Sequence, residues 1–79
     1  MSRKKSLGST IAFLRDEASL SQEALAEKSG VHRTYISQLE RDLKSPTVET
    51  LTRIAKALEM KLSTLIQLTE KGSDELQGE

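Results

Sequence analysis

The sequence contains no cysteine and no tryptophan, and it has only one histidine, one tyrosine and one phenylalanine among 79 residues. Without cysteine there is no disulfide and no thiolate ligand, and the single His32 cannot form a multi-histidine metal site. We therefore expect no metal and no other cofactor. An enzyme is not expected either, because His32 has no evident partner for nucleophilic catalysis and no phosphate-binding glycine loop occurs.

Long apolar runs are also missing. No stretch approaches the roughly 20 apolar residues that a membrane-spanning helix requires, so we expect no membrane association and a cytoplasmic protein. A chain of 79 residues is sufficient for one small domain.

The formal net charge is zero, with twelve basic and twelve acidic residues, but the charges are unevenly distributed. Three basic residues lie at positions 3–5, whereas residues 72–79 contain three acidic residues and no basic one. The first 71 residues therefore carry an excess of positive charge. We expect a flexible basic arm over residues 1–8, a folded domain over 9–69 and an acidic, disordered tail over 70–79.

Helical periodicity dominates the part of the sequence between these ends. Apolar residues recur at spacings of three and four, and no alternating run of apolar and polar residues indicates a strand. The predicted fold class is therefore all-α. We expect Ser9 or Thr10 to cap the first helix, which would bury Ile11, Leu14 and Ala18.

Capping and breaking residues divide the rest of the chain into four further short helices, so that five helices form a compact globule. The residues expected at the boundaries are Ser21 and Gly30 for the second helix, His32 and Arg41 for the third, Thr47 after the break at Pro46 for the fourth, and Ser63 for the fifth. The residues expected inside the fourth helix are Val48, Leu51, Ile54, Ala55 and Leu58.

The stretch "QEALAEKSGVHRTYISQLER", residues 22–41, has the pattern of a helix-turn-helix. Such a motif needs a small residue where two helices approach and a glycine where the backbone turns, and Ala26 and Gly30 occupy these places. The positions that fit the pattern are Leu25, Ala26, Gly30, Val31, Ile36 and Leu39. Ser29 departs from it, because a more apolar residue is usual there.

Over residues 9–68, the pattern "LSQEALAEKSGVHRTYISQLER…PTVETLTRIAKAL" resembles the lambda-repressor-like family, also called the xenobiotic-response-element family. The segment "HRTYISQLER" is similar to restriction-modification controller proteins, and phage-type repressors and antitoxins share much of it. The resemblance implies a five-helix DNA-binding domain with a central helix-turn-helix. It also implies a bacterial or phage-derived protein.

The third helix is the expected reader of DNA bases. Its polar residues lie on one outward face, opposite Ile36 and Leu39. Arginine can bond two guanine acceptors, glutamine can do the same to adenine, and threonine can pack its methyl group against thymine. By the resemblance, the base-reading residues are Arg33, Thr34, Ser37 and Gln38.

A second set of residues is expected to hold the DNA backbone without reading sequence. By the resemblance, Gln22 at the start of the second helix grips a phosphate, where the helix dipole adds attraction. The other members of this set are His32, Tyr35, Arg41 and Lys44. Tyr35 either touches DNA at the groove edge or flanks the core with its hydroxyl in water. His32 is a cap or surface side chain at the helix start, a phosphate contact or a base contact.

Two further assignments concern the protein itself. The resemblance implies that Arg15 and Glu40 form a partly buried ion pair that holds the third helix at a fixed angle. Apolar residues surround much of the fifth helix, so it either completes the monomer core or forms a homodimer interface. The residues expected in that interface are Leu62, Leu65, Ile66 and Leu68.

The function predicted from the sequence is a sequence-specific transcription regulator that binds double-stranded DNA as a homodimer on a pseudo-palindromic operator. Two recognition helices about 34 Å apart would enter successive major grooves. A restriction-modification controller is the narrower form of this prediction. The alternative is an antitoxin-like interaction module that binds a toxin or another protein partner. Residues 3–5 would follow the DNA backbone or remain a solvated segment.

Overall fold

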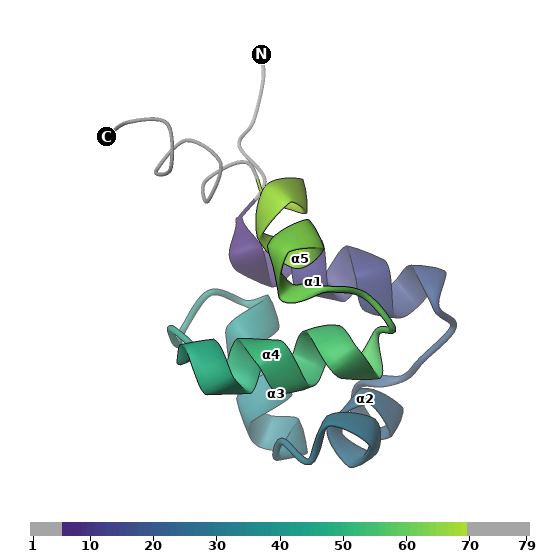
Figure 1. Cartoon of the computed structure of the whole chain (residues 1–79). Coiled ribbons are helices and arrows are strands. Elements are labelled where there is room, and N and C mark those ends of the chain that lie inside the picture. Colours follow the sequence, from purple (N-terminus) through teal and green to yellow (C-terminus); the bar gives the residue numbers. More distant parts are fainter. Residues whose placement is uncertain (1–5, 70–79) are drawn as a thin grey trace.

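The computed structural model describes residues 6–69, which fold into five helices with no strand among them (Figure 1). The helices are α1 (Leu7–Glu17), α2 (Gln22–Ser29), α3 (Arg33–Glu40), α4 (Val48–Ala57) and α5 (Leu62–Leu68). The prediction of a five-helix, all-α domain is therefore confirmed.

Two of the helix starts follow the predicted capping residues. The hydroxyl of Ser21 accepts a hydrogen bond from the Ala24 amide at 3.0 Å, and that of Thr47 accepts one from the Thr50 amide at 3.1 Å. In each helix the hydroxyl satisfies one of the first-turn amides, which have no carbonyl partner inside the helix.

The predicted starts of α1 and α5 are wrong. The N-cap of α1 is Ser6, whose hydroxyl accepts from the Ser9 amide at 3.1 Å, so the helix begins before Ser9 and Thr10. The N-cap of α5 is Lys61, without a side-chain cap, and Ser63 lies inside the helix. The expected flexible arm over residues 1–8 is accordingly too long, because residues 6–8 belong to the folded domain. Residues 1–5 and the expected tail over 70–79 lie outside the described residues.

The core takes at least one fully buried aliphatic side chain from every helix. These side chains are Ile11 of α1, Leu25 of α2, Ile36 and Leu39 of α3, Ile54 of α4 and Leu65 of α5. Leu65 was predicted in the dimer interface, and this prediction is wrong because its side chain is 0% exposed within one chain. Two residues predicted inside are outside: Val48 is 70% exposed, and Ala18 follows the last turn of α1 and is exposed.

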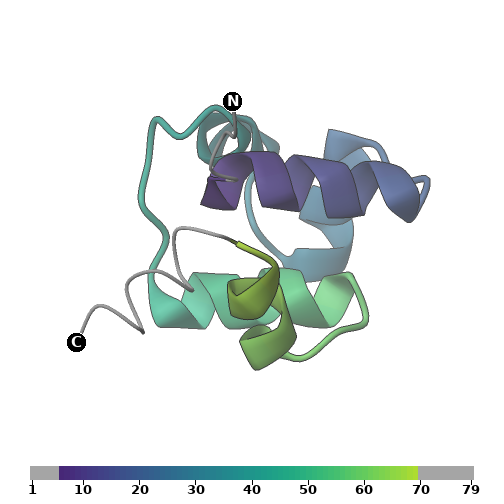
Figure 2. The same ribbon diagram turned by 90° about the horizontal axis from the view of Figure 1, so that it is seen from above.

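The helix contacts place α3 between α1 and α2, while α4 packs on α2 and α5, and α5 packs on α1. Seen from above, α1 and α4 lie on opposite sides of the domain (Figure 2). The third helix is thus supported on two sides by helices that come before it in the chain. This arrangement leaves one long side of α3 free for another molecule.

Candidate nucleic-acid interface

The corner between α2 and α3 depends on Gly30. Its φ is 73°, in the left-handed region that side chains with a Cβ rarely adopt, and its amide donates to the Ala26 carbonyl at 2.8 Å. The Val31 amide bonds to the same carbonyl at 3.2 Å. Because this corner reverses the chain within a few residues, α2 and α3 can form the predicted helix-turn-helix.

Ser29 shows why a polar residue is accepted at an apolar position of the motif. Its side chain is buried, and its hydroxyl donates to the Leu25 carbonyl at 2.7 Å and accepts from the Val31 amide at 3.3 Å. The hydroxyl therefore has partners on both sides of the turn, so its burial leaves no unsatisfied polar group.

The polar face of α3 is arranged much as predicted. Arg33 and Thr34 in the first turn are exposed, whereas Ser37 and Gln38, one turn later, are half-buried. All four lie away from Ile36 and Leu39, which enter the core. The structure thus brings the four predicted base-reading residues onto one side of one helix, and the two in the first turn are the exposed ones. These four predicted base-reading residues are Arg33, Thr34, Ser37 and Gln38.

Residues near the ends of α3 differ in how exposed their side chains are. His32 is the N-cap residue and is exposed, and its side chain makes no capping hydrogen bond. Tyr35 is half-buried and packs against the core, which favours the reading in which it flanks the core. Arg41 and Lys44, after the last turn, are exposed and so remain available to phosphates.

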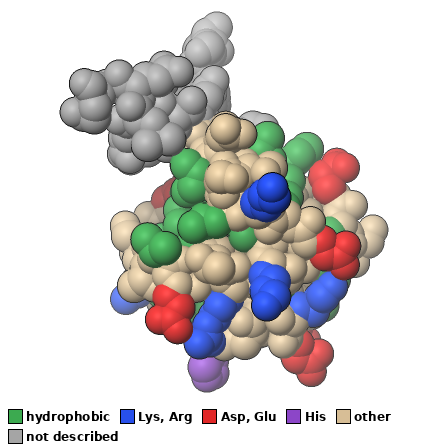
Figure 3. All heavy atoms as spheres, in the orientation of Figure 1, with side chains coloured by type: hydrophobic (Ala, Val, Ile, Leu, Met, Phe, Trp, Pro, Cys, Tyr) green, Lys and Arg blue, Asp and Glu red, His purple; other side chains and the backbone are tan. Residues whose placement is uncertain are grey.

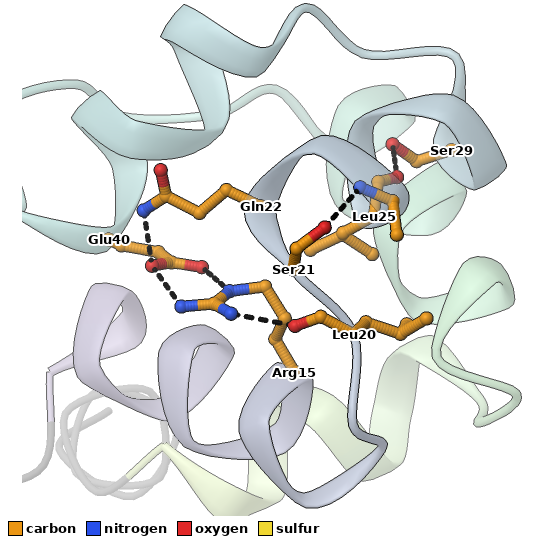
Figure 4. Close-up of polar contacts among 8 residues, drawn as sticks. Arg15, Leu20, Ser21, Gln22, Leu25, Ser29 and Glu40 are labelled. Atoms are coloured by element: carbon orange, nitrogen blue, oxygen red, sulfur yellow. Dashed lines mark hydrogen bonds and ion pairs between the residues drawn. The ribbon is translucent and has the colours of Figure 1, made fainter.

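A polar network fixes the C-terminal end of α3 (Figure 4). The Arg15 guanidinium of α1 donates from Nε to Glu40 Oε2 at 2.6 Å and from Nη2 to Glu40 Oε1 at 3.1 Å. A third bond runs from Arg15 Nη1 to the Leu20 carbonyl at 2.7 Å. The predicted ion pair is therefore present, with two parallel bonds, and it ties α1 to α3 and to the loop before α2.

Gln22 joins the same network. Its Nε2 donates to Glu40 Oε1 at 2.9 Å, so Glu40 receives bonds from both helices that support α3. The phosphate contact predicted for Gln22 stays a prediction, and a Gln22 amide held on Glu40 would meet DNA from a fixed position. The hydrogen bonds that Arg15 donates to Glu40 raise the pKa of Arg15, as does the attraction of the Glu40 and Asp16 charges, against the opposing effect of burial.

Charged side chains of both signs surround α3. Residues 6–69 contain equal numbers of basic and acidic side chains, but the two acidic residues at the end of α3, Glu40 and Asp42, are bonded within the protein. Three basic residues are exposed near α3: Arg33 at its start, and Arg41 and Lys44 after its end. On the face drawn in Figure 3, where α4 and α5 lie in front of α3, Lys and Arg side chains are interspersed with Asp and Glu, and hydrophobic side chains gather around α5.

The predicted dimer residues separate into two groups. Leu65 is a core residue, and Leu62 and Ile66 are half-buried against the core. Only Leu68 is largely free, at 44% exposed. Sequence reasoning missed Val48, the first residue of α4, which is more exposed than any of these.

Three residues important for the position of α3 were also missed: Ser6, Gly8 and Asp42, which meet where α1 begins and α3 ends. Nothing in local periodicity pairs positions more than 30 residues apart. Within residues 6–69, no group of three or more side chains could hold a metal ion. No described helix is long and apolar enough to span a membrane.

Comparison with known proteins gives matches across this whole region. A family model described as Helix-turn-helix (HTH_3) matches residues 11–65. Control protein C.SmaI of Serratia marcescens is 42% identical over 78 residues, which cover 99% of this chain and 90% of that protein.

Two solved structures have similar folds. The restriction-modification controller protein C.AhdI from Aeromonas hydrophila is 32% identical with a TM-score of 0.73, covering 75% of this chain and 89% of the other. SinR, a master regulator for biofilm formation, solved in complex with DNA, is 34% identical with a TM-score of 0.72, covering 76% and 97%.

Proposed function

This chain belongs to the helix-turn-helix family of DNA-binding regulators, and on that premise we propose that it binds a pseudo-palindromic operator as a homodimer, with one α3 helix in each of two successive major grooves. Its similarity to C.SmaI and C.AhdI supports the narrower role of a restriction-modification controller. The DNA-bound state of SinR supports double-stranded DNA as the partner.

The observation that carries the proposal is the free polar side of α3. The side chains of Arg33 and Thr34 are exposed on the first turn. Ile36 and Leu39 are buried in the core and hold the helix that carries these donors in place. An α-helix fits the major groove, where arginine distinguishes guanine by two hydrogen bonds. The alternative function, an antitoxin-like module, lacks support of this kind from the three relatives described above, which are two controllers and a DNA-bound regulator.

Selection of bound sequences from random duplexes is the first test, since it reports the operator, its symmetry and its half-site spacing together. Arg33→Ala is then expected to weaken binding by about 1–3 kcal/mol at particular base pairs, because it removes a bidentate contact to guanine. The measurement is the dissociation constant for the operator and for single-base variants of it.

Lys56→Ala is the matched control for Arg33→Ala. Lys56 is also exposed and carries the same charge, but it lies in the last turn of α4, whereas the main helix contacts of α3 are with α1 and α2. We expect Lys56→Ala to leave the discrimination between bases almost unchanged. An equal loss on every sequence for Arg33→Ala would reassign Arg33 to the DNA backbone.

The homodimer is tested best at Leu68, because this side chain is exposed and its replacement does not open the core. Leu68→Asp should raise the dimer dissociation constant about 30-fold, the effect of burying a charge without a partner in an apolar interface. Sedimentation equilibrium measures this change. Ser63→Asp, an exposed position in the first turn of the same helix, is the control. An unchanged dimer in Leu68→Asp would place the interface elsewhere.

A further inference from the structure

Three helices of this domain end on a residue other than glycine in the left-handed conformation. Ser19 after α1, Asp42 after α3 and Glu59 after α4 have φ of 59°, 60° and 61°. At the end of α3 the Asp42 amide donates to the Leu39 carbonyl at 3.0 Å and the Leu43 amide to the Gln38 carbonyl at 2.8 Å. Glycine is the usual residue at this position of such a helix end, so each of the three side chains is held at a conformational cost.

Asp42 differs from the other two in what its side chain does. Its Oδ2 accepts from the Ser6 hydroxyl at 2.7 Å, and its Oδ1 accepts from the Gly8 amide at 3.0 Å. Among residues 6–69, the side chains of Ser19 and Glu59 make no comparable bond. The carboxylate of Asp42 therefore reaches from the end of the recognition helix to the first turn of α1.

The first turn of α1 needs this carboxylate. It has no acidic residue of its own, although a negative charge is favourable at a helix N-terminus. Ser6 satisfies the Ser9 amide, and Asp42 satisfies the Gly8 amide, which is another first-turn donor without a partner inside the helix. The side chain that ends α3 thus also caps α1.

The two attachments between α3 and α1 lie far apart along α1. Glu40 holds Arg15 in the last turn, and Asp42 holds Gly8 in the first turn, seven residues earlier. At 1.5 Å per residue, this separation is about 10 Å along the helix axis. One attachment allows α3 to pivot about it, whereas two separated attachments fix its direction relative to α1.

We propose that Asp42 is a positioning residue for DNA binding, because its bonds to Ser6 and Gly8 clamp the end of α3 and so set where Arg41 and Lys44 meet the phosphates. This inference rests on the proposed function. Asp42 itself is not proposed to contact DNA. Asp42 acts through the helix that it holds.

The clamp predicts that Asp42→Gly weakens DNA binding, whereas a simple surface role predicts that the same change strengthens it. If Asp42 were only an exposed acidic residue, Asp42→Gly would relieve the left-handed backbone and remove a charge that repels phosphate, so the protein would become more stable and bind DNA more tightly. Glu59→Gly is the matched control, because it relieves the same φ and removes the same charge. We expect Glu59→Gly to raise the unfolding midpoint by roughly 4–8 °C.

For Asp42→Gly we expect no such rise, and about a ten-fold loss of affinity for the selected operator, corresponding to one lost positioning contact. Amide hydrogen exchange at Gly8 should become about ten-fold faster. Asp42→Asn keeps one acceptor oxygen and tolerates the left-handed region, so it should bind within about three-fold of the parent protein.

Parallel gains in midpoint and operator affinity for Asp42→Gly and Glu59→Gly, with unchanged exchange at Gly8, would overturn the clamp. If the parent protein selects no DNA sequence, the proposed function fails. The unfolding midpoints and the Gly8 exchange rate would then still decide whether the contact between Asp42 and α1 holds the two helices together.

Discussion

Replacing Glu40 with alanine is expected to lower the free energy of unfolding by about 3 kcal/mol, measured by urea denaturation. The Glu40 side chain is only 6% exposed and that of Arg15 is 18% exposed, so the variant would leave the guanidinium largely desolvated without its partner. Gln22 would also lose its acceptor. Removing one member of a buried pair costs far more than the pair contributes as a whole, because the remaining charge is uncompensated.

Glu49→Ala supplies the comparison. Glu49 pairs with Arg53 one turn along α4 at 3.2 Å, but their side chains are 77% and 54% exposed. Water and salt screen such a pair, and its loss is expected to cost less than about 0.5 kcal/mol. If Glu40→Ala and Glu49→Ala destabilised the protein equally, the network at the end of α3 would not hold the fold.

The decrease in the free energy of unfolding caused by Glu40→Ala should not depend on pH from neutral to mildly alkaline conditions. The pKa of Arg15 is raised in the folded protein, chiefly by its hydrogen bond to Glu40. A raised pKa contributes stability that is fully present below the unfolded pKa and is lost only as the pH rises through the folded pKa, far above this range. Arg15 therefore stays charged throughout the range in which the experiment is done.

DNA binding offers a second measurement on the same variant. Glu40 links α3 to both α1 and α2, so its removal should loosen the recognition helix as well as the fold. We expect affinity for the operator to fall more than affinity for unrelated duplexes, since phosphate contacts tolerate a misplaced helix better than base contacts do. This comparison separates the effect of a misplaced recognition helix from the effect of a smaller fraction of folded protein.

The sequence predicted the parts of this domain that depend on neighbouring residues. Ser21 and Thr47 are caps, and Gly30 has the left-handed turn that the motif requires, because each effect acts within one helical turn. The Arg15–Glu40 pair came from the family resemblance, since residues 25 positions apart show no local signal.

Errors arose where the outcome depends on contacts between distant segments. Leu65 and Leu68 both appeared as surplus apolar residues on a short helix, but only packing against α4 and α1 decides that Leu65 is in the core. The start of α1 is an exception, because Ser6 caps the helix through the Ser9 amide within one turn and local sequence could have indicated it. Val48 begins α4 and faces outward, although its spacing matches the buried stripe.

Gly8→Ala is expected to destabilise the protein by about 3 kcal/mol, against the usual effect of this substitution. Inside a helix, alanine is normally about 1 kcal/mol more favourable than glycine. A Cβ on Gly8, however, would collide with the Leu39 carbonyl oxygen and lie 2.8 Å from that of Glu40. Both are backbone atoms in the last turn of the recognition helix, so they cannot move aside without displacing α3.

Gly30→Ala separates this steric effect from a conformational one. Among residues 6–69, a Cβ on Gly30 would meet only Arg53 Nη1, at 3.7 Å, so the cost there comes from its φ of 73° and should be about 1–2 kcal/mol. Denaturation of both variants gives the two costs. If Gly8→Ala proved neutral or stabilising, α1 and α3 would not approach as closely as described, and the Asp42 clamp would lose its geometric basis. A large loss in Gly8→Ala together with faster exchange of the amides in the first turn of α1 would show that this contact helps to hold the first turn of α1 against the helix proposed to read DNA.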